Sequence, residues 1–371
     1  MIGRACAAGL AAIFVCSTAA AQPRWRLVED LRIGGGDDGP TSFNDIRDVA
    51  VDKSGRVYVL DYQTQEIRLF GADGKFIRLL GRSGAGPGEF RQPNGIRLAP
   101  DGTLWVNDHR NARYTVFSST GDFAKQVSVA PWGYGFRWDG TFDAQGRLME
   151  AIPLRTNPAD RSARVIRRYD PAAAKFDSLT IPSCFESGQY KDWSVTWKNG
   201  TMSGVSAIPF APMAVSHITP TGTWLCALGD EYHVKLLRFN GGAPISEVKS
   251  TSSAVPISAA ARDSAIKRFY APPSNVPPGT LDESRIPTAY ARIEEVDVDD
   301  EGRIWVRRRA AIGLAIDIWS FNGKLVATID APVYFEKYRP FIVRNGALYV
   351  VVTDADGVPA IVRYRIRANA G

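Results

Sequence analysis

The chain has 371 residues, with 45 Lys and Arg against 39 Asp and Glu and a formal net charge of +6 at pH 7. Its basic residues are interspersed with acidic ones, whereas a nucleic-acid-binding surface usually carries a basic stripe. The composition therefore argues against a nucleic-acid partner. The apolar runs are short, rich in Val, Ile and Leu, and broken by 34 glycines and 23 prolines. This pattern is typical of an all-β chain.

The N-terminus has the pattern of a secretory signal peptide over residues 1–21. Arg4 supplies the positive charge, an apolar run covers 10–15, and three alanines at 19–21 form the cleavage site. No later segment reaches 18 consecutive apolar residues, so we expect no transmembrane segment in the mature protein. The predicted location is periplasmic or secreted.

Four cysteines are present, and the first two, Cys6 and Cys16, fall within the predicted signal peptide. A lipid anchor on Cys16 is the alternative to simple cleavage, but the bulky residues before it disfavour such a site. Cys184 and Cys226 then form the single candidate disulfide, with two buried thiols as the alternative. No histidine lies near either residue in a recognisable nucleophile motif, so neither cysteine is expected to be catalytic.

A repeated pattern runs through the chain, and each copy places a strand, a tight turn ending in glycine, and a second strand in succession. Apolar residues lie four positions before and two positions after each of these glycines. A third strand ending at an aromatic residue follows each copy. The six glycines are Gly55, Gly102, Gly146, Gly222, Gly302 and Gly346.

Such units cannot bury both faces alone, and packing them radially around an axis solves this problem. The sequence predicts an all-β fold: a six-bladed β-propeller of four-stranded antiparallel blades, forming one domain over 22–371. The strand-like run at 24–34 supplies the missing outer strand of the last blade and so closes the ring. The predicted blades lie near 44–81, 93–128, 136–181, 213–250, 290–330 and 337–367, with insertions at 183–212 and 251–289.

The second copy resembles an NHL repeat. Gly88-Glu89-Phe90 leads into Pro93 and Gly95-Ile96, followed by Asp101-Gly102 and then Asp108. The match is specific in the second blade, fair in the first, and reduced to the glycine and apolar frame in the others. The chain is similar to secreted bacterial NHL-like six-bladed propellers. This resemblance implies the fold and leaves the activity open, because propellers host many unrelated functions.

In a propeller the inner strands line a central channel, and ligands usually meet its mouth. The polar and aromatic residues at the starts of these strands are therefore candidate ligand-binding residues. They are Asn44, Asp48, Asn94, Arg137, Trp138, His217, Glu295 and Arg339.

Three of these residues, Asp48, Asn94 and Glu295, have the oxygen ligands that calcium prefers. The resemblance extends to propeller lactonases, which hold a divalent cation at the channel mouth. The alternative to a binding function is thus a metal-assisted hydrolase or lyase, and calcium is the cofactor considered. Polar channel residues that bind only water and one another are the simpler explanation. No catalytic motif is present, so the sequence favours a binding module over an enzyme.

Both insertions are candidates for function. The first brings Trp193 and Trp197, which suit stacking on a sugar or an apolar peptide, or packing onto the blades. The second begins with a predicted helix capped by Ser258 and stopped by Pro272-Pro273. We expect the protein to bind a small molecule, a glycan or a protein at the propeller face.

Overall fold

The repeated glycines all lie in turns with left-handed backbone, with φ between 67° and 86°. In the first copy the Gly55 N–H donates to the carbonyl of Asp52 at 3.1 Å, closing the turn between two strands. The carboxylate of Asp52 also accepts a hydrogen bond from Arg56 Nε at 2.6 Å. The same aspartate–arginine pair recurs in the third and fifth copies. Each glycine permits a conformation that other residues adopt at a cost, so the repeat specifies hairpins.

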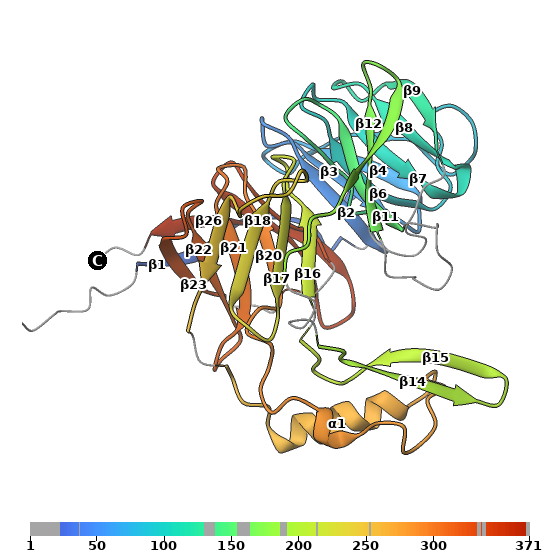
Figure 1. The fold of residues 1–371 in the computed structure, drawn as a ribbon. Helices are drawn as coiled ribbons and strands as arrows, with labels where there is room; N and C mark the ends of the chain where they lie inside the picture. Colours follow the sequence, from blue (N-terminus) through green and yellow to red (C-terminus); the bar gives the residue numbers. More distant parts are fainter. Residues whose placement is uncertain are drawn as a thin grey trace, which may run out of the picture.

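The computed structural model describes residues 23–36, 38–129, 138–153, 164–185, 191–212, 214–251, 254–331, 335 and 339–368. Within them the repeats form six blades of four strands, in which each strand pairs antiparallel with the next (Figure 1). Blade 1 is β2 (Ile46–Val51), β3 (Val57–Asp61), β4 (Glu66–Phe70) and β5 (Phe76–Leu80); blade 2 is β6 (Pro93–Leu98), β7 (Leu104–Asp108), β8 (Arg113–Phe117) and β9 (Phe123–Ser128); blade 3 is β10 (Thr141–Phe142), β11 (Leu148–Pro153), β12 (Arg164–Asp170) and β13 (Lys175–Thr180); blade 4 is β16 (Ala214–Ile218), β17 (Trp224–Leu228), β18 (His233–Leu237) and β19 (Ser246–Lys249); blade 5 is β20 (Glu295–Val298), β21 (Ile304–Arg309), β22 (Leu314–Trp319) and β23 (Leu325–Ala331); blade 6 is β24 (Phe341–Arg344), β25 (Ala347–Thr353), β26 (Pro359–Ala368) and β1 (Arg24–Gly34).

The strand β1 closes the last blade, as the sequence predicts. It pairs antiparallel with β26 over nearly its whole length, from Trp25 opposite Ala368 to Gly34 opposite Ala360. Its first residues also pair parallel with β23, where Arg24 lies opposite Thr328. This strand therefore joins blades 5 and 6 into one continuous sheet and links the two ends of the ring. The predicted all-β, six-bladed propeller fold is confirmed.

The hydrophobic core is divided into clusters that lie between neighbouring blades. One cluster joins Leu60 and Leu69 of blade 1 to Ile96 and Val106 of blade 2. Equivalent clusters join blades 2 and 3, 3 and 4, 4 and 5, 5 and 6, and 6 and 1. Since each sheet buries its two faces against two neighbours, the stability of the fold depends on closure of the ring.

The two insertions pack against each other, an arrangement that the sequence did not indicate. The first contains a hairpin of β14 (Ser194–Asn199) and β15 (Met202–Ala207), and the second contains α1 (Ala259–Tyr270). Val195 and Ile208 bury themselves with Leu281 and Ile286, and α1 packs against this cluster. In Figure 1 the hairpin and α1 lie together, to one side of the blades. We call these residues, 194–212 and 258–289, the hairpin–helix unit.

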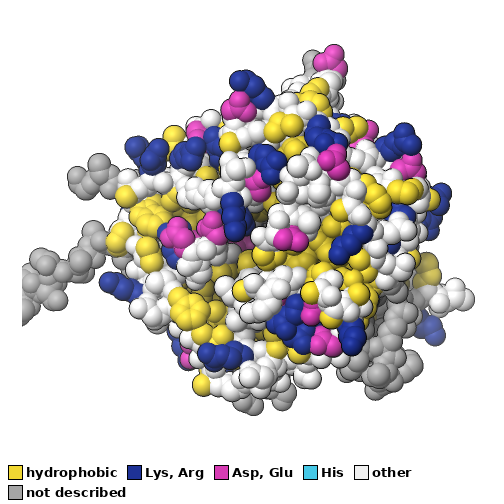
Figure 2. Space-filling model, turned by 90° about the horizontal axis from the view of Figure 1, so that it is seen from above, with side chains coloured by type: hydrophobic (Ala, Val, Ile, Leu, Met, Phe, Trp, Pro, Cys, Tyr) yellow, Lys and Arg dark blue, Asp and Glu magenta, His cyan; other side chains and the backbone are white. Residues whose placement is uncertain are grey.

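The helix itself begins and ends where the sequence predicts. The Ser258 hydroxyl accepts a hydrogen bond from the backbone N–H of Ala261 at 3.2 Å, which caps the first turn. The helix ends at Tyr270, two residues before Pro272. No helix in the described part of the chain is long and apolar enough to cross a membrane. Figure 2 shows basic and acidic side chains interspersed on the surface seen from above.

Candidate functional site

Asp48, a candidate ligand at the channel mouth, connects two blades. Its side chain is fully buried on β2 of blade 1 and accepts a hydrogen bond from the backbone N–H of Ile96 at 3.0 Å. It also forms an ion pair with Arg97 of blade 2. Arg97 in turn donates to the carbonyl oxygens of Trp138 and Gly140 in the chain entering blade 3, both at 2.6 Å. These polar groups thus connect three successive blades near the start of their inner strands.

Trp138 belongs to a buried polar network between blades 2 and 3. Its indole N–H donates to Glu150 at 3.1 Å, and its ring stacks on Tyr114 with centroids 5.5 Å apart. Glu150 also pairs with Arg167 at 2.6 Å. Burial, and then the Glu150 carboxylate, raise the pKa of Tyr114 well above its ordinary value, so the phenol remains a hydrogen-bond donor. The network has the partners that a buried polar group needs for stability.

Other candidates also lie at blade boundaries. Arg339, before β24, pairs with Asp45 of blade 1 at 3.1 Å. The carbonyl of the buried Asn94 accepts a hydrogen bond from the backbone N–H of Trp138 at 3.0 Å. Asn44 is exposed, and its backbone N–H donates to the Asp61 carboxylate at 2.9 Å. The ligand-binding role of these side chains stays a prediction.

The remaining candidates are dispersed. His217 lies half-buried on β16, opposite Leu225. Trp193 and Trp197 are half-buried in the first insertion. Trp197 packs over the backbone of Gly204 on the partner strand and donates to the Ser206 hydroxyl at 2.9 Å. Its indole therefore stabilises the hairpin. Arg137 and the predicted signal peptide lie outside the described residues.

A pocket of about 200 Å³ lies where the hairpin–helix unit meets blade 5. One wall comes from the end of the first insertion, another from the chain that enters β20, and a third from β21 and β22. Of the candidates from the sequence, it contains Glu295. The lining residues are Phe210, Ala211, Tyr290, Ala291, Ile293, Glu294, Glu295, Arg307, Arg309, Leu314 and Phe335.

Two arginines and two glutamates supply the charges of this pocket. Arg309 pairs with Glu294 at 3.1 Å, and its guanidinium carbon lies 4.7 Å from the centre of the Tyr290 ring. The Arg307 side chain is more deeply buried, with Glu295 at 3.8 Å and Asp297 at 3.5 Å. Its guanidinium stacks on the Phe341 ring at 4.5 Å. The site therefore combines aromatic surface with charges of both signs.

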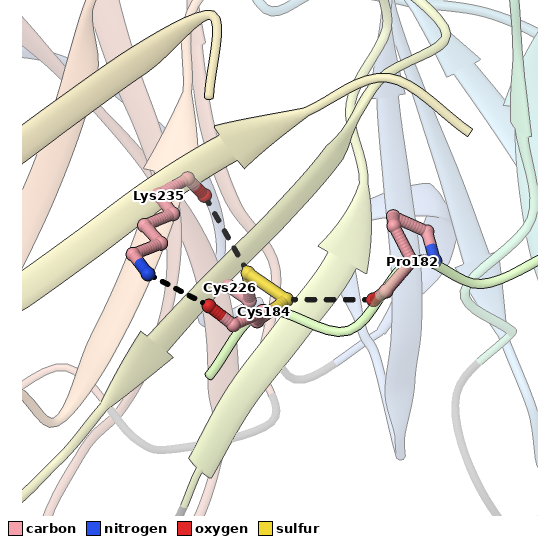
Figure 3. The surroundings of a disulfide bond; sticks show 4 residues. All are labelled: Pro182, Cys184, Cys226 and Lys235. Carbon is pink, nitrogen blue, oxygen red and sulfur yellow. Dashed lines mark hydrogen bonds between the residues drawn. A yellow bond between two sulfur atoms is a disulfide. The ribbon is translucent and has the colours of Figure 1, made fainter. Parts of the chain in front are cut away.

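A disulfide anchors the first insertion to blade 4. Cys184 bonds to Cys226 of β17, with Cα atoms 6.3 Å apart. Figure 3 shows the Lys235 side chain of the adjacent strand pointing toward Cys184, and its ammonium donates to the Cys184 carbonyl at 2.9 Å. The ammonium also lies 4.8 Å from the Phe185 ring. The insertion thus leaves the propeller at a fixed point.

Sequence reasoning missed most of the pocket, although one signal was present. The short basic run at 306–310 lies on β21, where side chains alternate between faces. Arg307 and Arg309 therefore share one face, while Arg308 pairs with Asp317 on the other at 2.7 Å. Phe210 and Tyr290 line the pocket because the two insertions pack against each other, and no local sequence pattern predicts this packing. Among the described residues, no group of three or more His, Cys, Asp or Glu side chains is arranged to hold a metal ion.

Comparisons with known proteins agree with the fold. A family model, DUF5128, described as a 6-bladed beta-propeller, matches residues 40–124, which cover blade 1 and most of blade 2. A mouse protein, NHL repeat-containing protein 3, is 27% identical over 111 residues, which is 29% of each chain. The match thus spans less than a third of that relative. The resemblance to NHL-repeat propellers is confirmed.

Two solved structures share the architecture over almost the whole chain. One is a member of the DUF4221 family from Bacteroides vulgatus, with a TM-score of 0.54, 10% identity, and coverage of 94% of this chain and 99% of the other. The second is a candidate exported protein from Bacteroides fragilis, with a TM-score of 0.51, 11% identity, and coverage of 93% and 96%. At these identities the likeness shows the fold alone.

Proposed function

We propose that this NHL-like propeller is a binding protein that takes a small ligand in the pocket between the hairpin–helix unit and blade 5. The observation that carries the proposal is the lining of that pocket. Aromatic and aliphatic side chains form most of it, and a few charged groups converge on the same space. Concave sites with this composition are the usual binding sites for small molecules.

Two candidates at the starts of other inner strands, Asp48 and Trp138, have structural partners. Asp48 and Trp138 are almost fully buried and connect neighbouring blades. A ligand that recruited either side chain would break a buried hydrogen bond or ion pair, at a cost of about 1–3 kcal/mol or more. Glu295, which pairs with Arg307 at 3.8 Å, is half-buried and lines an open pocket. These contacts favour the pocket as the binding site over the buried residues at the starts of the other inner strands.

We also propose that the protein acts outside the cytoplasm, in the periplasm or after secretion. The pattern of residues 1–21 and the Cys184–Cys226 disulfide support this location, because disulfides persist in oxidising compartments. The likeness to a candidate exported protein points the same way. The test is the cellular fraction that contains the protein after expression of the full chain in its native host.

A fragment library screened by thermal unfolding tests the binding function. A ligand that binds the folded state raises the Tm, and this rise should disappear when Ala291→Trp fills the pocket. The matched control is Ala124→Trp, on an exposed position of β9 in blade 2, which should keep the response. Hits that stabilise Ala291→Trp as well as the parent protein would refute the pocket as the site.

A further inference from the structure

The most deeply buried charge in the pocket belongs to Arg307. Arg307 is only 5% exposed, and its Nε atom has no hydrogen-bond partner among the residues that the structure describes. A buried donor without an acceptor costs free energy, so a ligand oxygen at this point would remove that cost. The guanidinium is planar and recognises carboxylates with two parallel hydrogen bonds. Arg307 therefore favours a ligand that carries a carboxylate.

The two glutamates of the pocket favour a ligand that also carries a positive charge. Glu294 and Glu295 line the same pocket and match the charges of Arg307 and Arg309, so the formal charges of the described lining residues sum to zero. A simple anion would approach two carboxylates as well as the arginines, and a simple cation would approach both arginines. A ligand with one charge of each sign, close together, is complementary to this arrangement. An ammonium has three donors, which suit the carboxylate oxygens of Glu295.

The rest of the pocket is apolar. Phe210 and Tyr290 meet edge to face with ring planes at 88°, and the Ile293 side chain is buried beside them. This corner suits an aliphatic or aromatic group, since burying such a group removes apolar surface from water. The pocket of about 200 Å³ thus offers an apolar corner beside its charged groups, which suits a small ligand that has both kinds of surface.

We propose that the ligand is a free α-amino acid with an apolar side chain. Its carboxylate binds Arg307, its ammonium binds Glu295, and its side chain packs into the corner formed by Phe210 and Tyr290. This inference rests on the proposed function and specifies its ligand class. Lactones and sugars, which lack the paired charges, are excluded as the preferred ligands of this pocket.

Isothermal titration calorimetry with L-phenylalanine and matched analogues tests the proposal. Phenylalaninamide lacks the carboxylate, and 3-phenylpropionate lacks the ammonium. We expect each analogue to bind at least 10-fold more weakly than the parent amino acid, because each lacks one of the two charged contacts with the pocket. Equal affinity for all three compounds would overturn the proposal.

Variants assign the two contacts. Arg307→Lys keeps the positive charge but loses the planar fork, and should weaken L-phenylalanine at least 5-fold while leaving phenylalaninamide unchanged. Glu295→Gln, at a half-buried position, should weaken L-phenylalanine and leave 3-phenylpropionate unchanged. Glu301→Gln, at the far end of the same hairpin, is the matched control and should have no effect. If both pocket variants bind L-phenylalanine as the parent protein does, the assignment is wrong.

Failure of the ligand class can be separated from failure of the site. If amino acids do not bind but fragment hits are lost in Ala291→Trp, the pocket binds ligands and the amino-acid proposal is refuted. If L-phenylalanine binds Ala291→Trp with unchanged affinity, both the site and this inference are refuted. If Arg307→Lys unfolds, the selective effect of Glu295→Gln still decides the outcome.

Discussion

Phe210 packs edge to face against Tyr290, with ring centroids 5.4 Å apart. The first ring lies at the end of one insertion, and the second lies directly after the other, in the chain that enters β20. Both rings line the pocket, so the contact that joins the insertions also shapes the candidate site. The two insertions thus form one structural unit beside the candidate site, although blade 4 separates them in the sequence.

The contact between Phe210 and Tyr290 can be measured by a double-mutant cycle. Each alanine variant should destabilise the protein, and the double variant should cost less than the sum of the two. The coupling expected for an aromatic pair is about 0.5–1.5 kcal/mol. Denaturant unfolding of the four proteins gives the value. Strict additivity would show that the two rings contribute independently.

The ion pair between Asp48 and Arg97 should be important for stability. Asp48→Asn leaves the Arg97 guanidinium without its buried partner, and breaking such a pair costs about 3–5 kcal/mol. The matched control is Asp122→Asn, because Asp122 pairs with Arg78 across the same blade boundary but is 66% exposed. That change should cost less than about 1 kcal/mol. Similar losses in the two variants, compared by thermal and denaturant unfolding, would contradict a special role for Asp48.

Reduction of the Cys184–Cys226 disulfide should lower the stability. The bond closes a loop of 42 residues, which by chain entropy alone corresponds to about 4 kcal/mol. Thermal unfolding with and without a reductant measures the effect. The Cys184→Ser, Cys226→Ser double variant should have the low Tm in both conditions. A reductant effect that persists in this variant would have to arise elsewhere.

Glu247 should make stability depend on pH in the acidic range. Hydrogen bonds from His233, at 2.6 Å, and then from Lys249 lower the pKa of this carboxyl below its ordinary value. A carboxyl with a lowered pKa in the folded state stabilises the protein above its unfolded pKa, about 4.3. This stabilisation is lost as the pH falls through the folded pKa.

The Tm difference between the parent protein and Glu247→Gln should therefore be present at pH 7 and decrease as the pH falls below the unfolded pKa of about 4.3 and then through the lower folded pKa. Because the carboxyl is 39% exposed, we expect a difference of a few degrees at most. Unfolding scans at half-unit pH intervals measure it. A difference that stays constant down to pH 3 would exclude the carboxyl as its source.

Much of the fold could be predicted because the repeat is local. Glycines such as Gly55 specify a turn, and the alternating residues on either side specify two strands, so hairpins follow from short stretches of sequence. Closure by β1 was also predictable, because the last copy had three strands and the N-terminal run had no other partner. Ser258 and Pro272 likewise marked the helix in the second insertion.

The site was harder to predict because it depends on contacts between distant segments. Polar residues at the starts of inner strands, such as Asp48 and Trp138, have the composition of a ligand site, and the sequence did not show that they also form hydrogen bonds between blades. The pocket combines Phe210 with Arg307, which share no local pattern. Among the described residues, Glu295 alone was both a candidate in the sequence and part of the pocket.

The pairing of β1 with β26 also constrains the order in which the chain can fold during synthesis. Asp30, on β1, binds Arg363, on β26, at a sequence separation of 333 residues. While the ribosome makes the intervening blades, β1 has no partner from β26, and an unpaired strand edge can join to other chains. We therefore expect ring closure to be the last and slowest step of folding. A nascent chain that stalls before β26 should be prone to aggregation, whatever the state of its first five blades.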